Sequence, residues 1–200
     1  MLAITAPRLL LGYFLVCFAV AFVWPTLRVW RRERINALVL PRDDSAHGVV
    51  AAWFRGVVLT TLLLLGALAA GLPRSVVAPL TWLELDGVAM AGSLLLGVSL
   101  VWIVVAQAQM GRSWRIGIDA ATRPPLVRTG LFGRSRNPIF LGMRLTLAGL
   151  FLALPNAGTL ALLLLGEAMM QLQVRLEEAH LSAAFGAEYD AYRDAVPRWL

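Results

Sequence analysis

Two charged residues interrupt the longest apolar stretch of the chain, where a charge either does chemistry or holds helices together. Residues 138–174 contain only two charges, Arg144 and Glu167. Pro155 and Asn156 break this stretch near its middle and predict a tight turn between two helices. In an antiparallel hairpin with that turn, Arg144 and Glu167 lie at the same depth. An unpaired charge in hydrocarbon costs a few kcal/mol or more, so we expect an ion pair that either fixes the hairpin or forms the floor of a polar pocket.

The second half of this hairpin carries a polar stripe. Glu167, Gln171, Val174 and Glu178 recur at helical spacing, which places all of them on one face. A purely structural helix in lipid has little reason to carry two glutamates and a glutamine on one face. The stripe therefore indicates a binding site.

The same register gathers basic residues at one end of the hairpin. Arg134 falls opposite Glu177, and Arg136 falls opposite Arg175. Two like charges that face each other need an acid or a bound anion nearby, and Glu177 or Glu178 can supply one. We therefore expect the segments that carry these residues to meet at that rim.

The elements that must position these residues are membrane helices. The 200 residues are 59% apolar and 15% charged, against roughly 25% charged residues in ordinary soluble domains. This composition excludes an ordinary soluble globule, a disordered chain and a disulfide scaffold. Three uncharged stretches approach or exceed the ~20 residues that cross a bilayer; they are Leu9–Leu27, Gly56–Pro73 and Gly87–Gly111. With the hairpin they predict an all-α integral membrane protein with five transmembrane helices. Gly142, Thr146 and Gly149 add a small-residue face that permits close helix contact.

The arginines predict the orientation. All 18 basic residues are Arg, and only Arg8 and Arg74 lie outside the first loop, the third loop, the tail and the hairpin. Because basic residues are enriched in cytoplasmic loops, we expect the N-terminus outside and the rim of the hairpin and the C-terminus in the cytoplasm. The arginines that follow the first apolar stretch predict a retained anchor rather than a cleaved signal peptide. This pattern is typical of a multi-pass protein of a bacterial inner membrane or an ER-like membrane.

Two classes of partner are not expected. The arginines flank apolar runs, so we interpret them as headgroup anchors rather than as a surface that binds nucleic acid. The single cysteine, Cys17, and two distant histidines, His47 and His180, provide no metal-ligand pattern.

The chain after Leu181 turns amphipathic and less hydrophobic. Tyr189, Tyr192 and Trp199 suit an interfacial position, because each combines an apolar ring with a polar edge. The tail is therefore predicted to be an anchor helix on the membrane surface, and a lid over a pocket is the alternative.

Four groups of motifs stand in a fixed order along the second half of the chain. They are Gly111–Gly117 (GRSWRIG), Leu126–Phe132 (LVRTGLF), Arg136–Phe140 (RNPIF), and Glu177–Leu181 (EEAHL) with Phe185–Tyr192 (FGAEYDAY) and Val196–Arg198 (VPR). This ordered set resembles the isoprenylcysteine carboxyl methyltransferase / phospholipid methyltransferase family of integral-membrane enzymes, over roughly residues 107–199.

The resemblance implies an S-adenosyl-L-methionine-dependent methyltransferase that holds its cofactor at the rim of the last helices and takes a lipophilic methyl acceptor. It implies one transmembrane domain over residues 1–200, in which 1–106 supply the first three helices and 107–200 the cofactor-binding region. The candidate cofactor-binding residues are Leu126, Val127, Phe132, Arg134, Arg136, Asn137, Pro138, Phe140 and Glu177. The candidate catalytic residues are Arg144, Glu167 and Glu178, and His180 is a further candidate base.

The acceptor and the enzyme class leave alternatives open. Gln173 stands where the isoprenylcysteine branch has an arginine, so carboxyl O-methylation and lipid amine N-methylation both remain. Membrane sterol-type reductases have a similar C-terminal pattern but use NADPH, whose phosphate would need a denser basic cluster than Arg193 and Arg198. A non-catalytic membrane scaffold is the third hypothesis.

Overall fold

The protein is an all-helical bundle in the part of the chain that the computed structural model describes, residues 2–34, 41, 43–111 and 125–200. The α-helices are α1 (Leu2–Phe18), α2 (Trp24–Glu33), α3 (Ala46–Ala69), α4 (Asp86–Met110), α5 (Pro138–Ala153), α6 (Ala157–Phe185) and α7 (Ala187–Ala195). A π-helical turn, η1 (Ala19–Val23), joins α1 to α2, and three short 3₁₀ segments are η2 (Arg74–Val77), η3 (Thr81–Leu83) and η5 (Gly130–Gly133). The predicted all-α class is confirmed, whereas the predicted count of five transmembrane helices is not.

Four helical runs in the described residues are long and apolar enough to cross a membrane: Ala6–Arg32, α3, α4 and α6. The fifth predicted span, α5, has 16 residues, and at about 1.5 Å per residue it is shorter than a ~30 Å hydrocarbon layer. The α3 helix begins at Ala46 rather than at Gly56, because the Ser45 side chain accepts a hydrogen bond from the Gly48 N–H and caps it.

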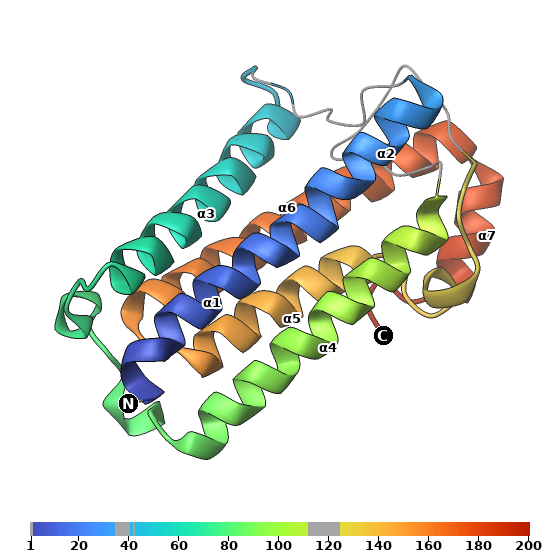
Figure 1. Ribbon diagram of the computed structural model, residues 1–200. Helices are drawn as coiled ribbons and strands as arrows, with labels where there is room; N and C mark the ends of the chain where they lie inside the picture. Colours follow the sequence, from blue (N-terminus) through green and yellow to red (C-terminus); the bar gives the residue numbers. More distant parts are fainter. Residues whose placement is uncertain (1, 35–40, 42, 112–124) are drawn as a thin grey trace.

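The five long helical runs close into a ring (Figure 1). In this ring α1 packs on α3, α3 on α6, α6 on α5, and α5 on α4. Contact between α4 and η1 closes it. Pro25 explains this last contact, since proline has no N–H to bond the carbonyl of Ala21 one turn earlier. The buried side chain of Gln107 on α4 donates to that carbonyl instead.

The hairpin turn that the sequence predicts is confirmed. Its cap is Asn156, whose side-chain oxygen accepts from the Thr159 N–H at 3.0 Å at the start of α6. The segment between η2 and η3 holds the turn from outside, because the Pro155 carbonyl accepts from the Leu80 N–H at 3.0 Å and the Ala157 N–H donates to the Ala78 carbonyl at 3.1 Å. The two helices of the hairpin are therefore fixed in an antiparallel register.

The small-residue face of α5 lies against α4. A Cβ atom added at Gly149 would lie 3.0 Å from the Gly92 carbonyl oxygen, so the two backbones approach closely. Thr146 Oγ1 lies 3.0 Å from Ser99 Oγ at the same interface. Small residues with hydrogen-bonding side chains are typical of tight helix pairs in lipid.

This close approach gives a testable prediction about α4. A Cβ atom at Gly92 would lie 2.8 Å from the Gly149 oxygen and 2.8 Å from the Leu152 carbonyl carbon, whereas Gly97 on the same helix faces open space. We expect Gly92→Ala to destabilise the protein by about 1–3 kcal/mol. Gly97→Ala serves as the control and should be neutral or slightly stabilising, because alanine favours helix. Thermal unfolding in detergent compares the two, and equal midpoints would contradict the packing.

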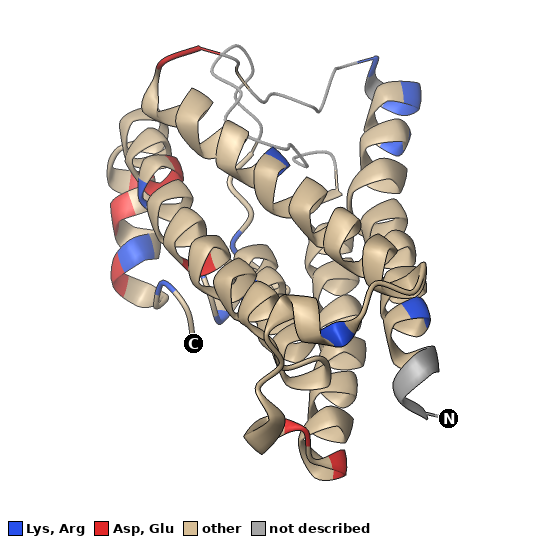
Figure 2. Cartoon of the chain, turned by 90° about the vertical axis from the view of Figure 1, so that its left-hand side faces the viewer, with Lys and Arg blue, Asp and Glu red and all other residues tan. Residues whose placement is uncertain are grey.

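Charged residues gather at one end of the bundle (Figure 2). We call this the α7 end, where α6 passes into α7. The opposite end carries Arg8 and the ion pair between Arg74 and Glu84, 2.8 Å apart. This distribution is the one that the arginine count predicts, and the cytoplasmic location of the α7 end stays a prediction.

Candidate active site at the α7 end

The ion pair predicted inside the hairpin is confirmed. Arg144 Nε lies 2.6 Å from Glu167 Oε2, and the Gln171 side chain donates to Glu167 Oε1 at 2.7 Å. The Arg144 guanidinium also lies 4.3 Å from the ring centroid of Trp199, within reach of a cation–π interaction. Arg144 is six residues into α5, about 9 Å from its N-terminus. Two opposite charges therefore neutralise each other inside the hairpin, next to Trp199 of the C-terminal segment.

Arg175 does not face Arg136 as the register predicts. Its guanidinium donates to the side-chain and backbone oxygens of Gln171, at 2.9 and 2.7 Å. These acceptors lie one turn away on the same helix and leave Arg175 exposed, so it needs no partner from α5. The acid expected near Arg136 is Glu178.

Glu178 is the centre of the polar cluster at the α7 end. Its buried carboxylate accepts from Arg136 Nε at 3.2 Å and from Asn137 Nδ2 at 3.1 Å. Arg198 Nη2 donates to the second oxygen at 2.8 Å. Glu178 and the side chain of Arg136 are each 8% exposed. Charge-assisted hydrogen bonds of this kind are strong, and here they join α5, α6 and the C-terminal segment.

Backbone acceptors in the tail complete the coordination of Arg136. Its Nη1 donates to the Val196 carbonyl at 2.6 Å and to the Arg193 carbonyl at 2.9 Å. Its backbone N–H donates to the Pro197 carbonyl at 3.0 Å. The C-terminal segment after α7 is thus bound along the start of α5, and this places Trp199 over Arg144.

The prediction that Tyr189 and Tyr192 anchor the tail at the membrane interface is wrong. Both are buried, at 1% and 6% exposure, because α7 folds back onto the segment before α5. The Tyr192 hydroxyl donates to the Phe132 carbonyl at 2.7 Å, and both rings pack beside Leu126. Burial raises the pKa of Tyr192 to about 12, so its hydroxyl stays protonated as the donor. The tail instead packs against the start of the hairpin.

The remaining predicted cofactor-binding residues differ in their burial and contacts. Pro138 is fully buried at the start of α5, and its carbonyl accepts from the Trp102 indole at 2.8 Å. Phe140, one turn further, packs toward the interior of the ring. Val127 is half-buried in the segment before η5. Arg134 is exposed.

Arg134 and Glu177, which the register places opposite each other, form no ion pair with each other. Glu177 is half-buried on α6 beside Glu178. Among the described residues, no hydrogen bond or ion pair involves the side chain of either one. Neither side chain is therefore engaged by another described residue.

Tyr189 is a candidate that the sequence analysis did not assign to the site. Its hydroxyl is buried and has no hydrogen-bond partner among the described residues, although the charges of Glu178 and Arg136 act on it. An unpaired buried hydroxyl costs roughly 1–3 kcal/mol, which makes it a candidate ligand contact. Its place in the FGAEY motif was the signal available in the sequence.

The types of these groups match those that bind an amphipathic, zwitterionic molecule. Arg134 offers a cation, Glu177 a carboxylate, Tyr189 a hydroxyl, and Leu126 and Val127 offer half-buried apolar surface. Within the described ranges, no group of three or more His, Cys, Asp or Glu residues is arranged to hold a metal ion.

A comparison with protein-family models matches residues 88–188, just over half of the chain, to phospholipid methyltransferase. The chain belongs to the phospholipid methyltransferase family. Comparisons with curated proteins and with solved structures found no match. The match extends from α4 to the start of α7 and confirms the resemblance inferred from the motifs. The matched range includes every candidate residue from Leu126 to Glu178, whereas Tyr189 and Arg198 lie outside it.

Proposed function

We propose that this member of the phospholipid methyltransferase family transfers a methyl group from S-adenosylmethionine to a lipophilic acceptor. The observation that carries the proposal is the convergence of three separate motifs on Glu178. Arg136 and Asn137 come from the RNPIF motif, Glu178 from the acidic pair, and Arg198 from the VPR segment. This convergence occurs at the end of a bundle in a chain that belongs to a methyltransferase family.

The groups without partners fit the cofactor. The carboxylate of S-adenosylmethionine matches Arg134, and its ammonium or ribose hydroxyls match Glu177 and the unpaired hydroxyl of Tyr189. Leu126 and Val127 offer apolar surface for adenine. The backbone carbonyl of Phe132 accepts a hydrogen bond from the Tyr192 hydroxyl and so fixes Tyr192 beside this surface.

The work of the chain itself is to align two reactants and to exclude water. The bound cofactor supplies an electrophilic methyl group on a sulfonium. Arg136 and Arg198, linked through Glu178, hold the start of α5 and the C-terminal segment in one position. In this proposal Glu178 is a positioning residue, since two guanidinium groups and an amide already occupy its oxygens.

Arg144 and Glu167 are the groups proposed to meet the acceptor. Only Nε of Arg144 bonds to Glu167, so its terminal nitrogens can receive a carboxylate or phosphate of a lipid. A carboxylate acceptor is ionised at neutral pH and needs no base, whereas an amine must first lose a proton. For an amine acceptor, we assign Glu167 or His180 as the proton acceptor.

The reductase and scaffold alternatives are less well supported. Arg193 is paired with Asp190 at 3.2 Å, and Arg198 is paired with Glu178 at 2.8 Å. Both tail arginines are therefore engaged by carboxylates, which counts against a nicotinamide-phosphate site there. The family match argues for an enzyme rather than a scaffold.

Ligand-dependent unfolding tests the proposal. S-adenosylhomocysteine at 100 times its Kd should stabilise the detergent-purified protein by about 2.7 kcal/mol, and NADPH should not stabilise it. Glu177→Gln should weaken the response to S-adenosylhomocysteine, whereas Glu188→Gln, at an exposed pair with Arg128, should leave it unchanged. A response to NADPH alone would support the reductase, and no response to either would support the scaffold.

A further inference from the structure

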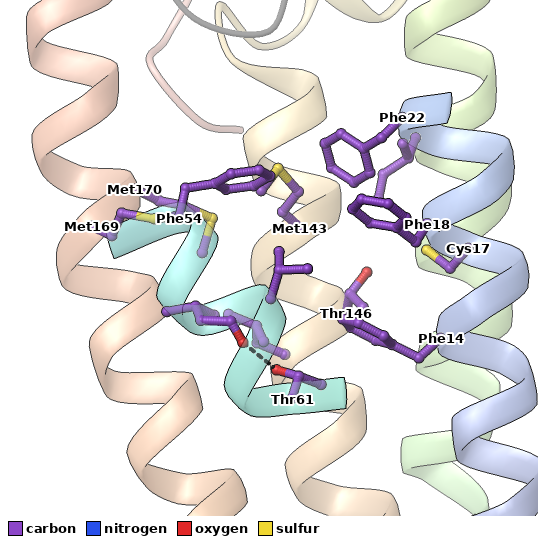
Figure 3. Close-up of a pocket in the computed structure, with 14 residues that line it drawn as sticks. Phe14, Cys17, Phe18, Phe22, Phe54, Thr61, Met143, Thr146, Met169 and Met170 are labelled. Atoms are coloured by element: carbon purple, nitrogen blue, oxygen red, sulfur yellow. Dashed lines mark hydrogen bonds between the residues drawn. The ribbon is translucent and has the colours of Figure 1, made fainter. Parts of the chain in front are cut away.

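The ring of helices encloses a cavity on the inner face of the α5–α6 hairpin (Figure 3). Its cavity volume is about 60 Å³, and it is partly open to its surroundings. Helices α1, α3, α4, α5 and α6 and the η1 turn all contribute to its wall. The lining residues are Phe14, Cys17, Phe18, Phe22, Phe54, Val57, Val58, Thr61, Ile103, Met143, Thr146, Leu147, Met169 and Met170.

The lining is suited to hydrocarbon. Phenylalanine and methionine predominate, and methionine side chains adapt to irregular apolar shapes. The only two hydroxyls in the wall are turned toward the backbone of their own helices. Thr61 Oγ1 donates to the Val57 carbonyl at 2.7 Å, and Thr146 Oγ1 to the Gly142 carbonyl at 3.0 Å. A polar headgroup would find no donor there, whereas an aliphatic chain loses nothing on entry.

The cavity has a packed floor on the side away from the α7 end. Leu65 and Leu154 belong to a buried leucine cluster and are 0% and 1% exposed. Phe14 packs against this cluster and also lines the cavity, near Thr61 (Figure 3). Phe14 and Thr61 therefore mark the closed end. From Phe54 to Thr61 the wall follows seven residues of α3, about 10 Å at 1.5 Å per residue.

The other end of the cavity leads toward the polar cluster. Phe140 packs against a group that includes Leu147, Met169 and Met170, and these three residues line the cavity. Asn137, which binds Glu178, lies three residues before Phe140, so about one helical turn separates the cluster from Phe140. This end of the cavity is thus the one nearer to Asn137 and the Glu178 cluster, where methyl transfer is proposed.

We propose that this cavity holds the hydrocarbon chain of the methyl acceptor, with Phe14 and Thr61 limiting how far the chain enters. The inference rests on the proposed function for the identity of the occupant. It assigns a binding role to α1 and α3, which lie outside the range that matches the family.

The only cysteine of the chain provides a direct reporter of occupancy. Cys17 lines the cavity and is buried, so its reaction with methyl methanethiosulfonate measures access to this space. The protein is held in a fluorinated surfactant, whose tails mix poorly with hydrocarbon, and dodecanol is the probe. We expect dodecanol at ten times its Kd to slow labelling about tenfold, because protection scales with 1 + [L]/Kd. Two results would overturn the proposal. One is no labelling of Cys17 in the absence of dodecanol, and the other is labelling that dodecanol does not slow.

Two variants test the closed end. Thr61→Phe should fill it and weaken protection by dodecanol about tenfold, which corresponds to about 1.4 kcal/mol, because the larger side chain overpacks the site. Leu63 is 64% exposed on the lipid-facing side of the same helix. In the control variant Leu63→Phe, dodecanol should therefore protect Cys17 as it does in the native chain. Phe14→Leu should enlarge the closed end and strengthen protection by the longer hexadecanol, which keeps the test decisive if Thr61→Phe does not fold. Equal protection in all variants would contradict the role of Phe14 and Thr61.

These measurements need no methyl donor, so they separate the two proposals. Protection by dodecanol without any response to S-adenosylhomocysteine would retain the chain-binding cavity and reject methyl transfer. A response to S-adenosylhomocysteine without protection would retain methyl transfer and reject this cavity as the acceptor site.

Discussion

Replacing Glu178 with glutamine is expected to destabilise the protein by about 3–5 kcal/mol, the loss seen when one partner of a buried ion pair is removed. The side chain of Glu178 is 10% exposed and its carboxylate is shared by two guanidinium groups. Glutamine keeps the shape but removes the one carboxylate that neutralises Arg136 and Arg198 among the described residues. The C-terminal segment should then detach from α5, because the Arg198 side chain loses its acceptor.

Thermal unfolding and limited proteolysis of the tail measure this effect. Glu188→Gln is the matched control, since Glu188 and Arg128 are each 49% exposed and such surface pairs contribute roughly 0–1 kcal/mol. Adding Arg198→Gln to Glu178→Gln removes one unpaired cation and should recover part of the loss. A tail that resists the protease in Glu178→Gln as in the native chain would show that the cluster does not hold it.

Replacing Arg144 with leucine is expected to produce the second largest loss, about 2–3 kcal/mol. This value lies below that for a fully buried pair because Arg144 and Glu167 retain 29% and 33% side-chain exposure. The single variant leaves the Glu167 charge in the hydrocarbon layer with only the Gln171 amide as a partner. It also removes the cation under Trp199.

A double-mutant cycle separates the pair from the packing. Arg144→Leu together with Glu167→Leu replaces both charges by apolar groups and should recover at least half of the loss. Urea or heat titrations in the same detergent provide the four free energies of unfolding. If the double variant loses the sum of the two single losses, Arg144 and Glu167 do not stabilise each other, and the hairpin depends on its other contacts.

The hairpin illustrates what can be predicted from local pattern. A proline and an asparagine within an apolar stretch leave few choices for the turn, and the Asn156 cap satisfies the first N–H groups of α6. Once the turn is placed, helical geometry alone aligns Arg144 with Glu167. The helix α5 was harder to define, because its 16 residues are apolar but short.

The partners at the α7 end could not be predicted in the same way. The antiparallel register of the hairpin pairs residues that are equally far from the turn along the chain. It assumes that both helices continue straight to the α7 end. At the rim the chain leaves α5 for a loop, and the tail returns to provide the Arg193 and Val196 carbonyls that Arg136 binds. Burial of Tyr189 and Tyr192 follows from that return, since α7 packs against Leu126.

The sequence by itself determined the lipid-embedded all-α class, the turn at Pro155, the depth of the Arg144–Glu167 pair and the family. These depend on composition, on helical spacing or on residue types that stand close together in the chain. Only the tertiary structure decided that Glu178 joins three segments, that the tail packs against the start of the hairpin and that a cavity with a floor lies inside the ring. Those features depend on which faces of distant helices meet, and apolar residues surround the long helices α3 to α6 so evenly that their pattern does not specify the partners.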